Sequence, residues 1–311
     1  MSGTTHASAA IAAAGRLAAG LSAAAAGASA AVSRHASRHD RGAAPGDRDA
    51  GASPARAGIV VRDVAKVYPG RHGDVLALAS TDVTVAPGQF VAIVGRSGCG
   101  KSTLLRLMAG LNAPSQGCVT VGGEVLRGRP PTFARFVFQD FSESLFQWQT
   151  VARNVAFGLR HRLRHSGLTP ADADHYLSQV GLASVANRYP HELSGGMQQR
   201  LAIARALASA PRFLFMDEPF SAIDALSRAR LQDLTLQLWH ELSLTVVMVT
   251  HDIDEAVYLA NRVLVLAPDG AGIAHDLEID LPWPRTQLGT KESAAFLDYR
   301  RSLTKWVVET E

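Results

Sequence analysis

Short apolar runs and helical patterns alternate along most of the chain, and together they predict its secondary structure. Four runs are almost entirely apolar, at 90–94, 213–216, 246–249 and 262–266. Runs of this length are typical of strands that are buried on both faces. Helical periodicity lies between them, notably at 198–209 and 226–242. Strands that alternate with helices predict an α/β fold with a parallel sheet.

The ends of these strands are where we expect the chemistry. In open parallel sheets, ligands bind beyond the carboxyl ends of the strands. Two further strand-like segments, 59–61 and 83–85, predict an opening sheet ahead of the first apolar run. A helix is expected at 104–109, directly after that run.

Composition excludes several classes of protein. The chain has 311 residues, of which 47% are hydrophobic and 19% charged, enough for one large globular domain or two small ones. Only two cysteines are present, which excludes a disulfide scaffold and a cysteine-based zinc module. The net charge of +3 is far from that of a dedicated nucleic-acid binder, so we expect no nucleic-acid partner. No window of eighteen strongly apolar residues predicts a membrane span.

Residues 1–57 differ from the rest of the sequence. They are rich in Ala, Ser, Gly and Arg and contain no aromatic residue, so they cannot bury enough apolar surface to offset the entropy of ordering. We predict a disordered N-terminal extension. An inert tail or mis-assigned start site is one interpretation, and a targeting or membrane-surface segment is the other.

A glycine-rich loop follows the first apolar run. Its residues are Gly95, Arg96, Ser97, Gly98, Cys99, Gly100, Lys101, Ser102 and Thr103. The spacing fits G-x-x-x-x-G-K-[ST] between a strand and a helix, where backbone N–H groups and the helix N-terminus cradle phosphates. Lys101 is then expected to pair with the β- and γ-phosphates of a nucleotide, and Ser102 to hold Mg²⁺.

Two carboxylates follow the second apolar run. Asp217 stands at the tip of that strand, where it can ligate Mg²⁺, and Glu218 comes next as a candidate general base for an attacking water. Together with the loop at 95–103, this pair predicts a nucleotide hydrolase.

A third motif, Leu193–Arg200, narrows the class. Ser194, Gly195 and Gly196 open a helix and form a second anion-binding N-terminus. One nucleotide needs two such sites only if two copies meet head to tail. Here the sequence resembles the ATP-binding cassette (ABC) ATPases, whose signature is LSGGQ, with Met197 in place of that Gln. The resemblance covers about 58–290.

The resemblance implies roles for four more residues. They are Tyr68, which would stack on adenine; Gln139, which would sense Mg²⁺ and the attacking water; Asp224, in a loop at 221–224 that couples the two sites of a dimer; and His251, which would contact the γ-phosphate. Ile223 stands in that loop where the family usually has Leu, a change that conserves volume.

Two stretches resemble the nitrate, sulfonate and taurine importers of that family. One surrounds Trp148, with Gln147 where the group has Pro, and the other is 281–285. Trp148 is expected either in the permease-docking groove or in the core of a helical subdomain. The basic run at 160–165 is either a solvated face or a contact with anionic lipid or the permease.

The predicted protein is therefore an α/β P-loop NTPase with a parallel core sheet, an antiparallel β subdomain and a helical subdomain at about 140–205. The ATPase domain spans 58–290, and 291–311 form a helical tail. The resemblance implies the ATP-binding and hydrolysing subunit of an importer for nitrate, sulfonate or taurine, with ATP and Mg²⁺ as cofactors.

The resemblance also implies the partners. They are a second copy, two permease subunits and, indirectly, a solute-binding protein, with the subunit peripheral on the cytoplasmic face of the inner membrane. A soluble ABC ATPase of DNA repair or translation is the alternative, although it usually carries a second cassette or a coiled-coil insertion. A small-molecule kinase has no use for Leu193–Arg200.

Cys99 stands two residues before Lys101 and close to a helix N-terminus. Both features favour the thiolate and predict a pKa below that of Cys118, whereas burial would raise it.

Overall fold

The computed structural model describes residues 57–309, except for 71–72, 142–143, 164–172 and 222. Apart from 160–163, these residues all belong to one compact unit, made of 52–159 and 170–311. The predicted disordered extension lies outside the described residues but for Ala57, and so do the side chains of the basic run at 160–165 and all of Ala222.

The core is a six-stranded sheet in the order β10-β9-β3-β8-β7-β6. Its strands are β3 (Phe90–Val94), β6 (Ala134–Val137), β7 (Phe213–Asp217), β8 (Thr245–Val249), β9 (Arg262–Leu266) and β10 (Ile273–Glu278). All neighbours pair in parallel except β10, which runs antiparallel to β9. Every residue of β3, β7 and β8 is buried, which is why the sequence shows them as unbroken apolar runs.

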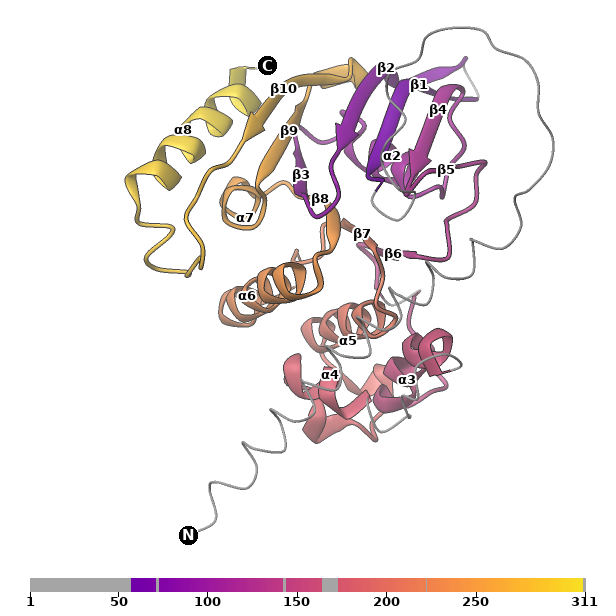
Figure 1. The fold of residues 1–311 in the computed structure, drawn as a ribbon, viewed down its shortest axis with the longest axis vertical. Helices are drawn as coiled ribbons and strands as arrows, with labels where there is room; N and C mark the ends of the chain where they lie inside the picture. The colour runs from indigo at the N-terminus through magenta and orange to yellow at the C-terminus, as the bar shows by residue number, and fades with distance from the viewer. Residues whose placement is uncertain (1–56, 71–72, 142–143, 164–172, 222, 310–311) are drawn as a thin grey trace, which may run out of the picture. The chain divides into compact units, whose positions relative to one another are not determined.

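A second sheet is wholly antiparallel, in the order β2-β1-β4-β5. Its strands are β1 (Ile59–Tyr68), β2 (Val75–Val85), β4 (Gln116–Val121) and β5 (Glu124–Val125). Helix α2 (Lys101–Met108) contacts strands of both sheets and shares one hydrophobic core with them. In Figure 1, α2 overlaps the strands of this sheet, and it contacts β1, β2 and β4. The predicted α/β fold with an antiparallel subdomain is confirmed.

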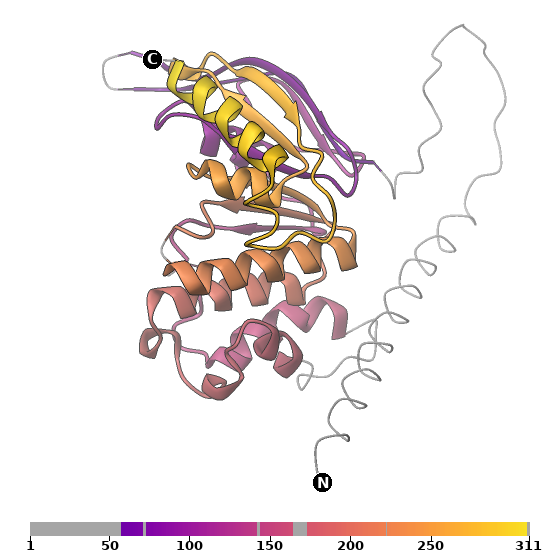
Figure 2. The ribbon, with the colours of Figure 1, turned by 90° about the vertical axis from the view of Figure 1, so that its left-hand side faces the viewer.

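Three helices form a separate layer. They are α3 (Val151–Leu163), α4 (Ala173–Gln179) and α5 (Gly195–Ala208), and the short turns η3 (Ala183–Val185) and η4 (Pro190–Glu192) both lie between α4 and α5. In Figures 1 and 2 they lie beyond α6 (Ala225–Leu242), at the end opposite the antiparallel sheet. This layer matches the helical subdomain that the sequence predicts, although the exact boundaries stay a prediction.

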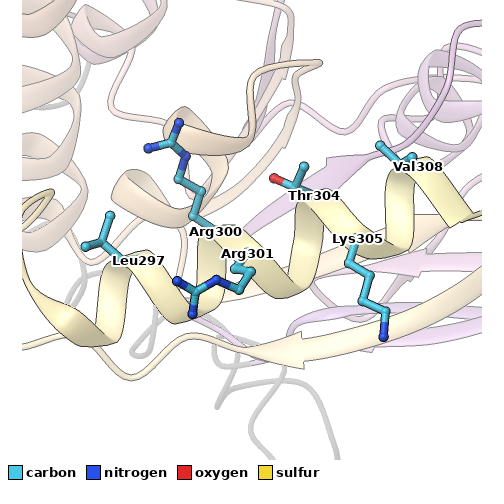
Figure 3. A pocket seen from close by; sticks show the side chains of 6 residues that line it. All are labelled: Leu297, Arg300, Arg301, Thr304, Lys305 and Val308. Atoms are coloured by element: carbon cyan, nitrogen blue, oxygen red, sulfur yellow. The ribbon is translucent and has the colours of Figure 1, made fainter.

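The chain continues past β8 with α7 (Ile253–Leu259), η5 (Pro268–Gly270) and α8 (Ala294–Glu309). Helix α8 packs on α7 and also contacts β9, and its residues Phe296 and Leu303 are fully buried. Its outer face carries Leu297, Arg300, Arg301, Thr304, Lys305 and Val308, shown in Figure 3. Within the described part of the chain, no helix combines the length and apolarity that crossing a membrane requires.

Candidate active site

The loop between β3 and α2 depends on glycine. Gly95, Gly98 and Gly100 all have positive φ, at 148°, 83° and 97°. A Cβ on Gly100 would lie 2.4 Å from the carbonyl oxygen of Ala77, and one on Gly95 would lie 2.9 Å from the Cys99 Sγ. Only glycine therefore lets the backbone turn here, and the turn presents the N–H groups at the start of α2, which lack partners within the helix.

Lys101 bends back over this loop. Its Nζ donates to the carbonyl oxygens of Gly95 and Arg96, at 2.8 and 2.7 Å, and the side chain is buried. These neutral acceptors satisfy two of the three ammonium donors but leave the charge without a counter-ion at hydrogen-bond distance in the loop. A phosphate placed in the loop would supply one.

Ser102 and Asp217 face each other across the end of β7. The Ser102 Oγ donates to the Asp217 Oδ1 at 2.8 Å, and Arg106 lies 3.7 Å from the Oδ2. Burial raises the pKa of Asp217, while Ser102 and Arg106 oppose that shift. Among the described residues, no cluster of three or more His, Cys, Asp and Glu could hold a metal. A hydroxyl and a carboxylate oxygen are the donors that Mg²⁺ uses when phosphates complete its shell.

Three strand ends meet at the Glu218 carboxylate. The Oε2 accepts from the Gln139 Nε2, which follows β6, and lies 3.2 Å from the Nδ1 of His251, which follows β8. Glu218 has a left-handed backbone, with φ at 46°, and its N–H donates to the carbonyl of Val249 at 2.9 Å. Such a conformation is costly for a residue other than glycine, and it often marks a functional position.

Tyr68 stands at the end of β1, on the antiparallel sheet. Its ring is partly exposed, its hydroxyl accepts from Asn112 at 2.8 Å, and the Lys66 Nζ lies 4.9 Å from the ring centroid. The structure therefore leaves an aromatic face open for stacking.

Ser194, Gly195 and Asp224 lie on the surface of the chain. Ser194 caps α5 by accepting from Met197 N at 3.4 Å, and Asp224 caps α6 by accepting from Ser227 N at 3.0 Å. The hydrogen bonds from the backbone and side chain of Ser227 lower the pKa of Asp224. A Cβ on Gly196 would be in ordinary contact with Ile223, so the start of α5 and the loop before α6 are neighbours.

The sequence predicted a lowered pKa for the Cys99 thiol, and that prediction is wrong. Its side chain is only 1% exposed and lies beneath Gly95. Burial raises the pKa of the Cys99 thiol, and the nearby Lys101 and backbone N–H groups only partly offset this. Cys118, on β4, is the exposed cysteine.

Two features near the site were missed from sequence. Arg106 stands four residues after Ser102, one helical turn further along α2, a spacing that predicts a shared face. Glu255, in the first turn of α7, is buried and bonded to Thr250. An acidic residue four positions after His251 at a helix start was the available signal, but it looks like ordinary first-turn charge.

An aromatic patch lies on the helical layer. We define it as Phe146, Trp148 and Phe157. Ring centroids are 5.4 Å apart for Phe146 and Trp148 and 4.7 Å apart for Phe146 and Phe157, and the Arg205 guanidinium lies 5.2 Å from the Phe146 ring. Trp148 is 72% exposed, which excludes the core position that the sequence left open.

Comparisons with known proteins agree on one family. Residues 78–221 match the model of the ABC transporter family. An ATP-binding protein of Brucella abortus is 48% identical over 217 residues, which are 70% of this chain and 82% of that protein. The nitrate import ATP-binding protein NrtD of Synechocystis is 44% identical over 224 residues, 72% of this chain and 83% of that protein.

Two further likenesses concern a longer relative and a solved structure. The bicarbonate transport ATP-binding protein CmpC of Synechococcus elongatus is 40% identical over 249 residues, 79% of this chain but 37% of that protein. The dimeric, post-hydrolysis structure of the ATP-binding cassette MJ0796 with ADP and Pi has a TM-score of 0.64 at 31% identity. That match covers 72% of this chain and 100% of that one.

Proposed function

Because this chain belongs to the ABC transporter family, we propose that it is the ATP-hydrolysing subunit of an importer for a small anion. The observation that carries the catalytic part is the meeting of Gln139, Glu218 and His251 at one carboxylate oxygen, beside a phosphate loop. Names of relatives at 40–44% identity support an inorganic anion as the solute, nitrate for one and bicarbonate for the other.

Nucleotide binding uses two separate parts of the domain. The loop from Gly95 to Thr103 surrounds the phosphates with N–H groups, and Lys101 exchanges its carbonyl partners for the β- and γ-phosphates. Tyr68 stacks on the adenine with its open face. Ser102, Asp217 and Gln139 would hold Mg²⁺, which neutralises phosphate charge when bound.

Hydrolysis centres on Glu218. Its carboxylate accepts a proton from the attacking water, while Gln139 orients that water. His251 contacts the γ-phosphate and, by its proximity to Glu218 Oε2, keeps the base directed at the same point. The left-handed backbone of Glu218 holds this geometry before the nucleotide arrives.

Two copies complete each site. Ser194, Gly195 and Gly196 of one copy approach the γ-phosphate held by the other, with the free N–H groups at the start of α5. Asp224 lies in the adjacent loop and transmits closure from one site to the other. The dimeric cassette MJ0796 supports pairing of this kind.

The aromatic patch docks the permease. Trp148 is exposed and packs on Phe146, which is itself held by Phe157 and Arg205, and an exposed tryptophan held in this way is a typical interface anchor. Two permease subunits then hold the dimer at the cytoplasmic face of the inner membrane, and a solute-binding protein delivers the anion to them.

Glu218→Gln tests the catalytic assignment. The amide keeps the size of the side chain but cannot accept the proton, so ATPase activity should fall about 10²–10⁴-fold. ATP binding should persist, and a dimer should accumulate with MgATP in size-exclusion chromatography. Near-normal turnover in the purified variant would remove Glu218 from this role.

Uptake assays test the transport assignment. Cells that express this chain together with its permease subunits should import nitrate or bicarbonate, and Glu218→Gln should abolish that import. Taurine and an alkanesulfonate serve as competing solutes. ATPase activity that no permease changes, with no uptake of any of them, would favour the soluble class of ABC ATPase.

A further inference from the structure

Glu255 is a buried carboxylate to which the mechanism above gives no role. It is 5% exposed. Its Oε2 accepts from the Thr250 Oγ1 at 2.8 Å, and its Oε1 accepts from the Gln232 Nε2, on α6, at 3.1 Å. Both carboxylate oxygens therefore accept from uncharged donors, and these hydrogen bonds fix the Thr250 hydroxyl and the Gln232 amide in place.

These contacts hold both neighbours of His251. Besides donating to Glu255, the Thr250 hydroxyl accepts from the Asp252 N–H at 3.0 Å. The Asp252 Oδ1 accepts from the Glu255 N–H at 3.1 Å. The backbone on each side of His251 thus belongs to one hydrogen-bonded ring with Glu255.

His251 has little else to orient it. Its side chain is 64% exposed, and the contact recorded for it within the described chain is the one with Glu218, at 3.2 Å. Glu218, Thr250, His251 and Glu255 line one small hollow, together with Ser221, Arg228 and Asp252. Glu255 therefore lines the same hollow as Glu218 and His251.

If Glu255 served only to fill space in the interior, a neutral side chain would do so at a lower cost in free energy. Burial raises the pKa of Glu255, because desolvation penalises the charge. Replacing buried charged groups with well-packed neutral ones is often neutral or stabilising. A role in geometry explains the residue better than a role in stability.

We propose that Glu255 is a positioning residue: it fixes Thr250 and Asp252 and thereby sets His251 against Glu218 and the γ-phosphate. This inference rests on the roles proposed above for His251 and Glu218. A shift of about 1 Å in a catalytic group can cost about 100-fold in rate, so a small change in this ring is enough to be measured.

The hydrogen-bond directions provide a rescue. Gln287 Nε2 donates to Gln232 Oε1 at 3.3 Å, and Gln232 in turn donates to Glu255. In Glu255→Gln, the amide offers one oxygen where the carboxylate offers two, so only one of the two contacts keeps its acceptor. With the oxygen toward Thr250, two NH₂ donors meet at Gln232; with the oxygen toward Gln232, the Thr250 hydroxyl no longer donates to residue 255. The exchange of both residues, Glu255→Gln with Gln232→Glu, restores a donor and an acceptor at each contact.

The experiment compares these variants in the full-length chain. Glu255→Gln should lower kcat about 10- to 100-fold and lose the preference for a non-hydrolysable ATP analogue over ADP. The Kd for ADP and the Tm should stay near wild type, because ADP lacks the γ-phosphate that His251 contacts. The double exchange should recover at least half of kcat. Glu241→Gln, on the exposed face of α6, is the matched control and should change nothing.

Each other outcome is decisive. Normal kcat in Glu255→Gln, or a double exchange whose kcat stays as low as that of Glu255→Gln, overturns the proposal. A parallel loss of ADP affinity, Tm and kcat assigns Glu255 a structural role and also overturns it. His251→Ala separates the two levels: if it keeps full activity, the proposed function of His251 fails first, whereas if it is inactive and Glu255→Gln is not, only the present inference fails.

Discussion

At the scale of single residues, the active site is built from side chains that the backbone forces into unusual places. Glu218 directly follows a strand, yet it has a φ of 46°, which costs about 1–3 kcal/mol for a residue with a side chain. The turn brings its carboxylate to Gln139 and His251, while its N–H remains bonded to Val249. The strained backbone of Glu218 thus orients the carboxylate that we propose as the general base.

The two cysteines should differ in reactivity in the order opposite to that expected from sequence. Cys118 is exposed on β4, whereas Cys99 is buried and has a raised pKa, so less of it is thiolate near neutral pH. N-ethylmaleimide at pH 7 should modify Cys118 at least about tenfold faster. Peptide mass spectrometry over time measures both rates, and a Cys118→Ser variant isolates the slow one. Faster modification of Cys99 would contradict the burial argument.

Residue identities were more predictable than residue environments. Lys101, Asp217 and His251 could be found because each must follow a strand at a fixed offset, and such offsets are visible in sequence. The environment of Cys99 could not, because its burial comes from β9 and the loop folding over it: Leu266 and Cys99 both crowd Gly95. The sequence shows that Lys101 is near, which lowers the pKa of the Cys99 thiol, but it does not show the burial, which raises that pKa by more.

At the scale of elements, the interiors of strands were predictable, whereas apolar periodicity alone missed the starts of two helices. β3, β7 and β8 are fully buried, so their apolar runs mark them. The periodicity of α5 begins only at residue 198, but the motif at 193–200 predicted a helix opening at Ser194 to Gly196, and α5 begins at Gly195; α2 begins at Lys101 and not at 104. Gly195 and Gly196 have weak helix propensity, yet the Ser194 cap and contact with Ile223 hold them in the first turn.

Helix α8 offers a test of how such an element is held. Leu303 is fully buried, whereas Val308 is 55% exposed on the outer face (Figure 3). Leu303→Ala should destabilise the protein by about 2–5 kcal/mol, or roughly 5–15 °C in Tm for a unit of this size. Val308→Ala should shift stability by less than about 0.5 kcal/mol.

Differential scanning calorimetry of both variants measures the difference. Arg300→Ala is a further control, because its ion pair with Asp254 at 3.1 Å is largely exposed and pairs of this kind contribute little. Equal losses of Tm in Leu303→Ala and Val308→Ala would show that the burial of Leu303 does not hold α8 in place.

At the scale of the whole molecule, helix α5 connects the two surfaces for which we propose different tasks. Its first turn carries the Ser194 cap, and Arg205, near its other end, lies against Phe146 of the aromatic patch. About ten residues of helix separate the two points, roughly 16 Å. Burial lowers the pKa of Arg205 without preventing the guanidinium from packing on a ring. A rigid helix between the patch and the dimer surface can carry movement from one to the other.

Trp148→Ala should separate hydrolysis from transport. Since the indole is 72% exposed, truncation leaves no cavity, and the Tm and the ATPase activity of the isolated subunit should stay near wild type. Removing an aromatic anchor from an interface commonly costs about 2 kcal/mol or more, so permease co-purification and solute uptake should both fall at least about tenfold. Trp283→Ala is the matched control, because Trp283 is also partly exposed but packs on His240, away from the patch. Normal uptake in Trp148→Ala, or an equal loss in both variants, would show that the aromatic patch does not dock the permease.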